Sequence, residues 1–259
     1  MLLSLVRRLR RRALLRHPFP EAWRAIMDRN VPMIRRLPPE DRRELEGLIQ
    51  IFLAEKSFEG CGGQTVDDAV RVTIAAQACL LLLHRDTDVY PRLDVILVYP
   101  SSVRSRETRR EGLVVQERES VRLGESWSRG AVILAWDAVL AGAREVADGH
   151  NVTLHELAHQ LDGEDGAMDG EPPLRGRSSH ASWARVLGAE YQELLHRLQR
   201  GHRSDIDPYA ATSPPEFFAV ITEMFFERPR ALQRRHPALY RELAGFYRQD
   251  PASWPEARP

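Results

Sequence analysis

Two histidines and a glutamate lie at a spacing that can bind a metal ion. The run His155-Glu156-Leu157-Ala158-His159 separates the histidines by four residues. On a helix this separation places both imidazole rings on one face, one turn apart, where they can occupy two corners of a tetrahedral zinc site. Glu156 lies one step round the helix, where it can move a proton from water to a leaving amine. The run therefore predicts zinc-dependent hydrolysis of peptide bonds.

The residues around this run favour a helix over Val152–Leu161. Apolar side chains recur at the spacing of one buried helix face, and the histidines fall beside that face; the apolar residues are Leu154, Leu157, Ala158 and Leu161. The alternative is a helix with two partly exposed histidines and no metal. Because chance places two histidines and a glutamate at this spacing in only on the order of a few per cent of chains of this length, we prefer the metal site.

A catalytic zinc site needs a third protein ligand and an open position for water, and two acidic residues compete for the role. Asp165 follows at the distance of a compact motif that has a glycine turn, but Asp162 stands where that motif has glycine. Glu216 begins a later helix that can pack against the first, although its S-x-x-E pattern also fits a helix cap. The spacing favours Glu216. Glu223, two turns further on, can be a ligand or a hydrogen-bond partner of a histidine ring.

The apolar pattern predicts an α+β protein: a mostly helical single unit with one small mixed sheet. Helical spacing covers 21–58, 67–83, 137–146, 152–161, 182–200, 215–227 and 237–247. Strands are predicted at 94–100, 114–121 and 131–136. Glycines predict turns at 60–63, 124 and 130, and the polar stretch 101–112 predicts a loop. If the strand at 131–136 lies at a sheet edge, an extended peptide substrate can pair with it.

The composition is that of a globular protein with no general affinity for polyanions. The chain has 259 residues, of which 43% are hydrophobic and 29% charged, and its net charge is zero. Its two cysteines provide no disulfide framework, and the sequence contains neither a secretory signal nor an apolar stretch long enough to span a membrane. We therefore expect a soluble, cytoplasmic protein that does not bind nucleic acid directly.

Residues 1–17 differ from the rest of the chain because they carry six arginines among leucines and no acidic residue. This composition predicts a basic N-terminal arm, either a frayed helix or a disordered segment. Contact with an acidic surface or a membrane is the alternative. The remaining residues, 18–259, show no internal repeat and no linker, and are expected to form a single zinc metallopeptidase domain.

Seven longer motifs are distributed over most of the chain beyond the basic arm. They are Ile74–Leu80, Ile96–Ser101, Gly124–Trp127, His155–Asp162, Asp207–Ala211, Glu216–Val220 and Phe246–Pro251. Together these segments resemble the bacterial Mlc titration factor A family, also called DgsA anti-repressor proteins, which are zinc-dependent peptidases. The set is far more specific than the five-residue zinc motif alone.

The resemblance implies a zincin-like (gluzincin) fold with one zinc ion per chain on His155, His159 and Glu216, and with Glu156 as the general base. It also points to Tyr209, seven residues before Glu216, where the related catalytic domain of anthrax lethal factor has a tyrosine. This phenol either stabilises a developing oxyanion or packs on the core as a loop aromatic. The implied activity is cleavage of short peptides, including aminopeptidase activity. The family name implies the alternative, a regulatory protein that sequesters a transcriptional repressor, with the metal site secondary.

Overall fold

The computed structural model describes residues 2–85, 88–101, 105–111, 114–120, 130–174 and 177–255. Gly124–Trp127, one of the segments that carry the resemblance, lies outside these residues, and so does the turn expected at Gly124. The residues expected to form the metal site all lie within them.

Helices make up most of the described chain, and the sheet is small, so the expected α+β class is confirmed. The α-helices are α1 (Leu2–Leu14), α2 (Glu21–Asn30), α3 (Pro39–Glu55), α4 (Asp68–Leu80), α5 (Trp136–Arg144), α6 (Val152–Asp162), α7 (Arg177–Gln199), α8 (Pro214–Glu227), α9 (Pro229–Arg235) and α10 (Pro237–Tyr247). The 3-10 helices include η1 (Pro32–Arg36), η3 (Gly163–Asp165), η4 (Pro208–Ala211) and η5 (Pro251–Ser253). The strands are β1 (Ser57–Gly60), β2 (Val95–Tyr99), β3 (Ser105–Glu111), β4 (Val114–Ser120) and β5 (Ala131–Ala135).

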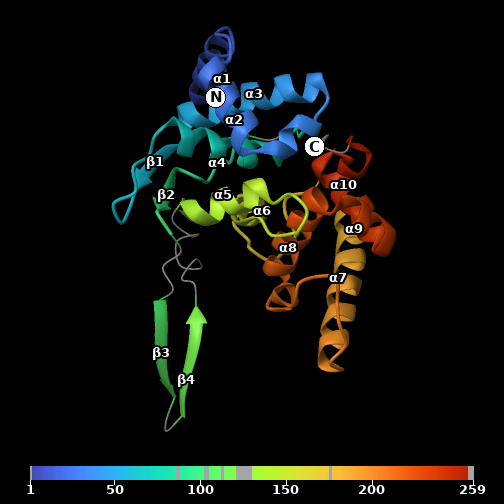
Figure 1. Cartoon of the computed structure of the whole chain (residues 1–259). Helices are drawn as coiled ribbons and strands as arrows, with labels where there is room; N and C mark the ends of the chain where they lie inside the picture. Colours follow the sequence, from blue (N-terminus) through green and yellow to red (C-terminus); the bar gives the residue numbers. More distant parts are fainter. Residues whose placement is uncertain are drawn as a thin grey trace.

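The helix α6 lies between two groups of helices (Figure 1). On one side it contacts α4, which packs against α2, α3 and α5; on the other side it contacts α8, which packs against α9 and α10. Both neighbours are buried along most of their length, α4 from Val72 to Leu80 and α8 from Phe217 to Glu227. A helix that is buried on all sides lies inside the core. Because α6 contacts two such helices, α4 and α8, it lies between them in the core.

The three-stranded sheet has the order β1-β2-β5, and both of its pairings are parallel. The central strand β2 and the edge strand β5 pair residue by residue, from Val95 with Ala131 to Tyr99 with Ala135. Among the described residues only β2 pairs with β5, which is the edge position expected for residues 131–136. The antiparallel pair β3–β4 forms a sheet of its own, so parallel and antiparallel pairings occur in separate sheets and not in one mixed sheet.

Two strands replace elements that the sequence analysis predicts differently. The expected helix over 21–58 is wrong at its last two residues, Ser57 and Phe58, which belong to β1. The expected loop over 101–112 is wrong at Ser105–Glu111, which is β3. The Lys56 ammonium donates to the carbonyls of Tyr90 and Leu93, and so holds the chain beside β2, where tertiary pairing overrides local spacing. The sequence of β3 contains no apolar residue, so only its pairing with β4 defines it as a strand.

A short helix also lies where the sequence analysis predicts none. The helix α9 begins at Pro229, whose fixed backbone angle suits a first helical turn. Only Pro229 and Leu232 of its residues are buried. Two buried positions in seven residues are too few to reveal a helical period, which explains the omission.

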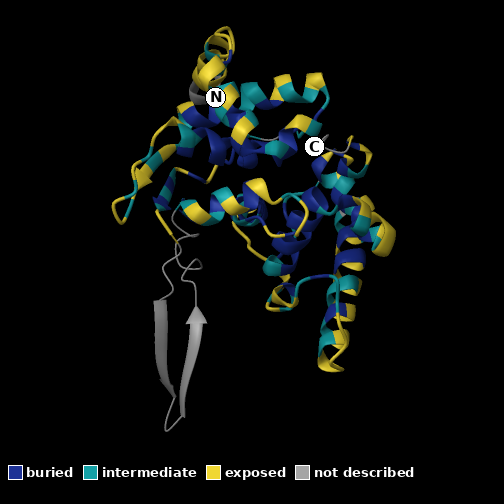
Figure 2. Ribbon diagram, viewed as in Figure 1, coloured by how far each residue is buried: buried dark blue, intermediate teal, exposed yellow. Residues whose placement is uncertain are grey.

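Burial is uneven along the molecule (Figure 2). The region around α4, α6 and α8 is mostly buried, whereas α1 is mostly exposed. This helix covers most of the basic segment 1–17 and contacts α3. No helix among the described residues is both long enough and apolar enough to cross a membrane.

Candidate metal centre

The first turn of α6 is fixed by Asn151, the residue that precedes it. Its side-chain oxygen accepts a hydrogen bond from the backbone N–H of Leu154 at 3.0 Å, which caps the helix. Its side-chain nitrogen donates to the carbonyl of Gly142 at 3.2 Å, at the close approach of α5. The start of α6 is therefore held against α5 by a single side chain.

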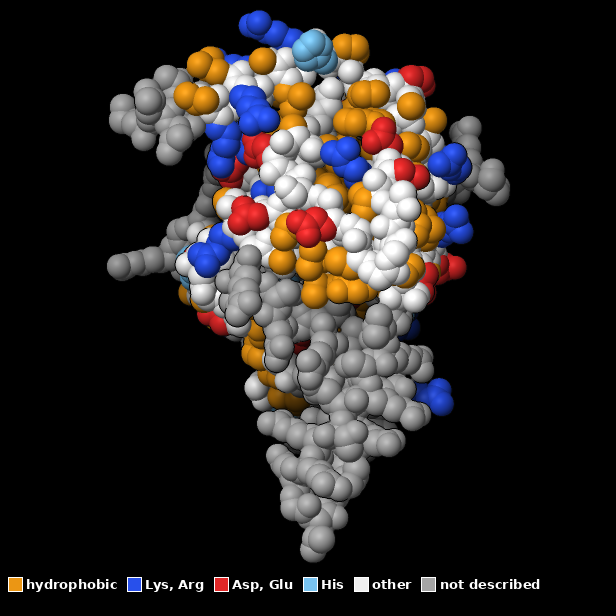
Figure 3. Space-filling model, turned by 90° about the vertical axis from the view of Figure 1, so that its left-hand side faces the viewer, with side chains coloured by type: hydrophobic (Ala, Val, Ile, Leu, Met, Phe, Trp, Pro, Cys, Tyr) orange, Lys and Arg blue, Asp and Glu red, His pale blue; other side chains and the backbone are white. Residues whose placement is uncertain are grey.

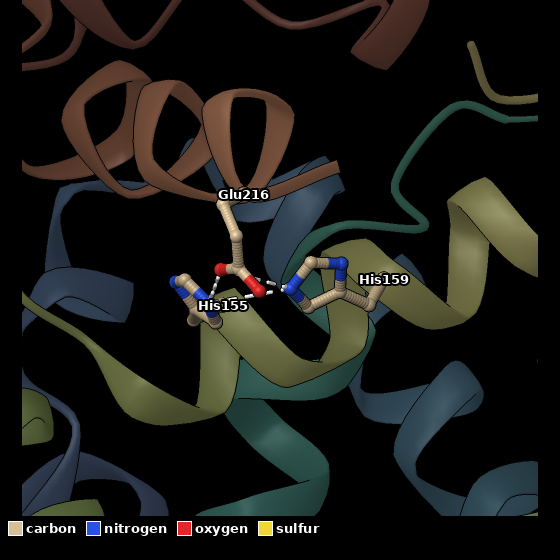
Figure 4. Close-up of side chains that lie close together, drawn as sticks. All are labelled: His155, His159 and Glu216. Carbon is tan, nitrogen blue, oxygen red and sulfur yellow. Dashed lines mark hydrogen bonds and ion pairs between the residues drawn. The ribbon is translucent and has the colours of Figure 1, made fainter. Parts of the chain in front are cut away.

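The predicted apolar face of α6 is buried, and the two histidines project from its other side. The buried apolar residues are Leu154, Leu157, Ala158 and Leu161. The side chains of His155 and His159 point toward the first turn of α8 (Figure 4). Four residues of separation place them one turn apart, with their ring centroids 4.9 Å from each other.

Glu216 approaches the histidines from the first turn of α8. The hydroxyl of Ser213 accepts a hydrogen bond from the backbone N–H of Glu216 at 3.4 Å, so Ser213 caps the helix as its S-x-x-E pattern predicts. The carboxylate of Glu216 does not complete a capping box, because it is directed at His155 and His159 (Figure 4). Ser213 therefore caps α8, and the Glu216 carboxylate is free of the cap and contacts both histidines.

Three donor atoms from the two helices converge on one point. Nε2 of His155 lies 3.0 Å from Oε2 of Glu216 and 3.3 Å from Nε2 of His159. Nε2 of His159 lies 3.5 Å from the same Glu216 oxygen. Ligands of a tetrahedral zinc ion, each about 2.0–2.1 Å from the metal, are about 3.3–3.4 Å apart. Among the described residues, these three form the one group of histidine, cysteine and acidic side chains placed to hold a metal ion.

Glu223 fixes the orientation of the His155 ring. Its Oε1 lies 2.7 Å from His155 Nδ1, on the side of the ring away from the three converging atoms. Its other oxygen accepts a hydrogen bond from the backbone N–H of Asn151. A carboxylate at Nδ1 favours the tautomer with the proton on that nitrogen, which leaves the Nε2 lone pair for a metal. Of the two roles that the spacing left open for Glu223, the geometry supports the hydrogen-bond partner.

The electrostatics of the cluster favour a bound cation. Burial alone would lower the pKa of His155, but hydrogen bonds to Glu216 and Glu223 raise it to about 10. Burial likewise opposes ionisation of Glu216, but both histidines lower its pKa to about 2. Burial lowers the pKa of His159 to about 4 and raises that of Glu156 to about 8. The negative surroundings of Glu156, Glu216 and Glu223 thus stabilise a positive charge on His155. A divalent cation bound at the same place would be stabilised in the same way.

Glu156 lies beside the cluster without joining it. Its residue is buried, with 3% of its surface exposed. Within the described part of the chain its side chain makes no hydrogen bond. The nearest charges acting on it are those of His155, Glu216 and Glu223. This is the position that the sequence analysis expects for a proton carrier.

Tyr209 lies at the edge of the site and is half exposed. It belongs to η4, whose first turn is capped by the carboxylate of Asp207. Its ring centroid is 6.0 Å from that of His155, and 54% of the residue is exposed. The half-exposed ring leaves both expected roles of this phenol open, as a hydrogen-bond donor to an oxyanion and as a loop aromatic packed on the core. Burial of part of the ring and the charges of Glu216 and Glu156 raise the pKa of the phenol to about 12, which keeps the proton available for donation.

The end of α6 is tied to the start of α8 through Gly170. Both carboxylate oxygens of Asp162 accept from the backbone N–H of Gly170 at 3.0 Å, and the Trp183 indole donates to its carbonyl at 3.1 Å. Gly170 has a φ of +82°, and a Cβ there would lie 2.6 Å from the carbonyl oxygen of Pro214. The two helices that supply the donor atoms are therefore linked by a position that only glycine fits. Asp162 serves this link and not an imidazole ring.

Asp165, the competing third ligand, lies outside the donor group. Its carboxylate accepts a hydrogen bond from the backbone N–H of Ala167 at 2.9 Å and stabilises its own turn. The residue is exposed to solvent. The geometry thus favours Glu216 over Asp165.

The sequence analysis missed two residues that organise the site. Asn151 immediately precedes the helix, and an asparagine at that position is a recognisable N-cap signal. Gly170 lies in a turn-rich stretch, and its contacts with Asp162 and Pro214 join segments that are distant in sequence. No local pattern could reveal it.

Comparisons with known proteins identify the family of the chain. The model of a family described as "Glucose-regulated metallo-peptidase M90" matches residues 5–248. A Synechocystis protein named "Uncharacterized protein slr2042" is 46% identical over 244 residues, which are 93% of this chain and 89% of that protein. Proteins named "Mlc titration factor A" from Klebsiella pneumoniae and Escherichia fergusonii are each 31% identical over 224 residues, or 85% of this chain and 84% of the relative. The resemblance drawn from the sequence motifs is confirmed.

Proposed function

Because the chain belongs to the glucose-regulated metallo-peptidase M90 family, we propose that it hydrolyses peptide bonds with one zinc ion held by His155, His159 and Glu216. The observation that carries the proposal is the convergence of their Nε2, Nε2 and Oε2 atoms at separations of 3.0, 3.3 and 3.5 Å. We assign the activity to residues 18–259 and place it in the cytoplasm.

The donor set fits zinc. Two imidazole nitrogens and one carboxylate are typical zinc ligands, whereas calcium and magnesium prefer sites made of oxygen atoms. Bound by three protein ligands, zinc lowers the pKa of a water molecule to about 7 and polarises a peptide carbonyl. The Glu223 carboxylate supports this set because it holds His155 with Nε2 facing the other two donors.

Glu156 is the general base in this proposal. It follows His155 directly on α6, is buried, and faces the charges of Glu216 and Glu223. Its carboxylate accepts a proton from the attacking water and passes that proton to the nitrogen of the leaving amine. The hydroxyl of Tyr209 donates a hydrogen bond to the oxygen that becomes negative as water attacks the carbonyl. The exposed ring of Tyr209 beside His155 lets the phenol reach a substrate.

The edge strand β5 gives an extended peptide a place to bind. It contacts α6, and one of its edges is paired with β2 while no other described strand covers the second edge. A peptide that adds to this edge satisfies the open backbone groups of β5 and lies along the helix that carries the histidines. This favours short, extended peptides as substrates.

The test of the proposal is a Glu156→Gln variant of the full-length chain, with zinc content measured in the same preparation. We expect kcat on a quenched-fluorescence peptide to fall by about 10²–10⁴-fold while zinc content stays unchanged, because the amide cannot accept the proton. The matched control is Glu145→Gln, at the exposed end of α5, which should retain wild-type activity. Unchanged cleavage by the Glu156 variant would exclude this residue as the base.

Aminopeptidase activity is the finer form of this proposal. It is tested by comparing a free aminoacyl-p-nitroanilide with its N-acetylated form. An aminopeptidase holds the free amine of its substrate, so acetylation should reduce kcat/KM strongly. Equal cleavage of both forms would assign the site to endopeptidase chemistry instead.

A second function is favoured by the names of the relatives, which describe them as titration factors of Mlc. We propose as the alternative that the chain binds a transcriptional repressor protein and that the metal site is secondary to this binding. The Glu156→Gln variant separates the two functions, because binding of a purified repressor should survive the loss of the base. If binding and cleavage are lost together, the two activities share the site.

A further inference from the structure

The helix α1 turns its apolar side toward solvent. Val6, Leu9 and Ala13 are separated by three and four residues, so they lie along one face of the helix. All three are exposed, Val6 by 57% and Leu9 by 56% of their surface. An amphipathic helix on a globular protein normally buries this face. Here nothing in the described chain covers it.

The opposite face of α1 is held to the protein by charged residues. Arg7 forms an ion pair with Asp88, and Arg11 pairs with both Asp88 and Glu55 at 2.6 Å. Leu14, on the same side, packs against the hydrophobic core. These contacts fix the rotation of the helix, so the apolar side chains are directed outward by the way α1 docks on its own protein.

Unpaired arginines border the exposed apolar face. At 100° per residue, Arg12 lies on one side of Leu9 and Arg10 lies on the other side of Val6, while Arg8 is one turn before Arg12. All three are exposed, and none forms an ion pair with a residue that the structure describes. At the top of the molecule in Figure 3, where α1 lies in Figure 1, Lys and Arg side chains are exposed beside hydrophobic ones.

We propose that α1 is an interfacial helix that binds the protein to an anionic phospholipid bilayer. Val6, Leu9 and Ala13 enter the boundary between headgroups and acyl chains, and the bordering arginines contact lipid phosphates. An apolar stripe edged by arginine is the pattern of helices that lie in the plane of a membrane surface. At 13 residues the helix is too short to cross a bilayer.

The aliphatic face distinguishes this partner from a nucleic acid. Polyanions in general would attract Arg8, Arg10 and Arg12. A lipid surface also rewards the burial of Val6 and Leu9, whereas a nucleic acid does not, because aliphatic side chains gain little from contact with phosphates. The proposal therefore predicts a binding reaction that depends on both kinds of residue and does not depend on the metal centre.

The test is co-sedimentation of the full-length protein with phosphatidylcholine vesicles, with and without phosphatidylglycerol, at low salt. We expect binding only to the vesicles that contain phosphatidylglycerol. The double variant Val6→Ser, Leu9→Ser should reduce the partition coefficient by at least about tenfold, since each buried methylene contributes favourably. The double variant Arg8→Glu, Arg12→Glu should reduce it at least as much.

A matched charge control is the double variant Arg200→Glu, Arg203→Glu, which changes the net charge by the same amount at exposed positions after α7. It should bind vesicles like the wild type. Failure of the wild-type protein to bind the anionic vesicles would overturn the proposal. So would binding that survives Val6→Ser, Leu9→Ser unchanged, which is the behaviour of a purely electrostatic site for nucleic acid or another polyanion.

Discussion

Three described histidines, His84, His155 and His236, each lie between two carboxylates, but only His155 belongs to the candidate metal centre. The half-buried His236 offers the comparison with His155. His155 has Glu223 at Nδ1 and Glu216 at Nε2, at 2.7 and 3.0 Å. His236, at the start of α10, has Glu190 at Nδ1 and Asp205 at Nε2, at 2.7 and 3.3 Å. Judged by these contacts alone, the two sites are nearly the same.

The difference lies in what else surrounds each pair of carboxylates. Asp205 also pairs with Arg235 at 3.2 Å, so a fixed guanidinium balances the negative charge around His236. In the described chain no lysine or arginine forms an ion pair with Glu156, Glu216 or Glu223. A second imidazole, His159, is present there instead, with Nε2 3.3 Å from that of His155. A second imidazole in place of a balancing cation is therefore what distinguishes the candidate metal centre from the pair of carboxylates around His236.

The largest effect is expected from Glu216→Gln. Removal of one carboxylate ligand should lower zinc affinity and kcat/KM by at least about 1,000-fold, tenfold beyond the upper range for losing an outer hydrogen-bond partner. Zinc per chain, measured by elemental analysis after dialysis, and peptide cleavage report the change. The parallel variant at His236, Glu190→Gln, should retain both zinc and activity. Equal loss of zinc in Glu216→Gln and Glu190→Gln would show that the surroundings of His155 and His236 do not differ in zinc binding.

Gly170→Ala tests whether the two helices of the metal centre depend on their link. Because φ is +82° and a Cβ would lie 2.6 Å from the Pro214 carbonyl, we expect the free energy of unfolding to fall by roughly 3 kcal/mol. Gly188→Ala in α7 is the control, since an added Cβ there meets nothing within 4 Å; it should raise stability by up to about 1 kcal/mol. Urea unfolding measures both. A tolerated Gly170→Ala would show that the link does not hold the helices.

Glu223→Gln refines the comparison within the metal centre. An amide in place of this carboxylate weakens the hydrogen bond to His155 Nδ1, so zinc affinity should fall by about 10–100-fold. Unlike Glu216→Gln, this variant should recover full zinc occupancy when zinc is added in excess. Competition with a coloured zinc chelator measures the affinity. If the Glu223→Gln variant failed to bind zinc even in excess zinc, Glu223 would have to be assigned as a metal ligand.

The smallest effect is a pH dependence at His236. The hydrogen bond to Glu190 raises the pKa of His236 against the opposing effect of burial, and Asp205, itself paired with Arg235, raises it further. The added stability is complete below the unfolded-state pKa of about 6.5 and is lost as pH rises through the raised folded-state pKa. His236→Gln should therefore cost up to about 1 kcal/mol near pH 6 and less as pH rises through the folded-state pKa of His236. Destabilisation that does not change with pH would show that the charge of His236 contributes nothing.

The half of the metal centre that one helix supplies could be predicted from the sequence. The spacing of His155 and His159 fixes their relative position once residues 152–162 are helical, and the apolar stripe fixes which side is buried. Glu216 is different, because spacing gave it two possible roles, a cap or a ligand. Its local sequence fits both, and only the packing of α8 on α6 turns its carboxylate toward the histidines.

The parts that the sequence could not predict depend on distant contacts. β1 is a strand because β2 lies beside it, and β3 is recognisable only through its pairing with β4. The role of Glu223 depends on which nitrogen of His155 it meets. Each of these is decided by the neighbours that the fold brings together, which a local pattern of residues does not contain.

The central claim is that His155, His159 and Glu216 hold one zinc ion from two helices. The most direct measurement is an anomalous difference map from crystals of the zinc-loaded protein, with data collected at the zinc absorption edge. We predict a single strong peak about 2.0–2.3 Å from Nε2 of both histidines and from a Glu216 carboxylate oxygen. A peak bound elsewhere, or a Glu216 carboxylate directed away from the peak, would contradict the account.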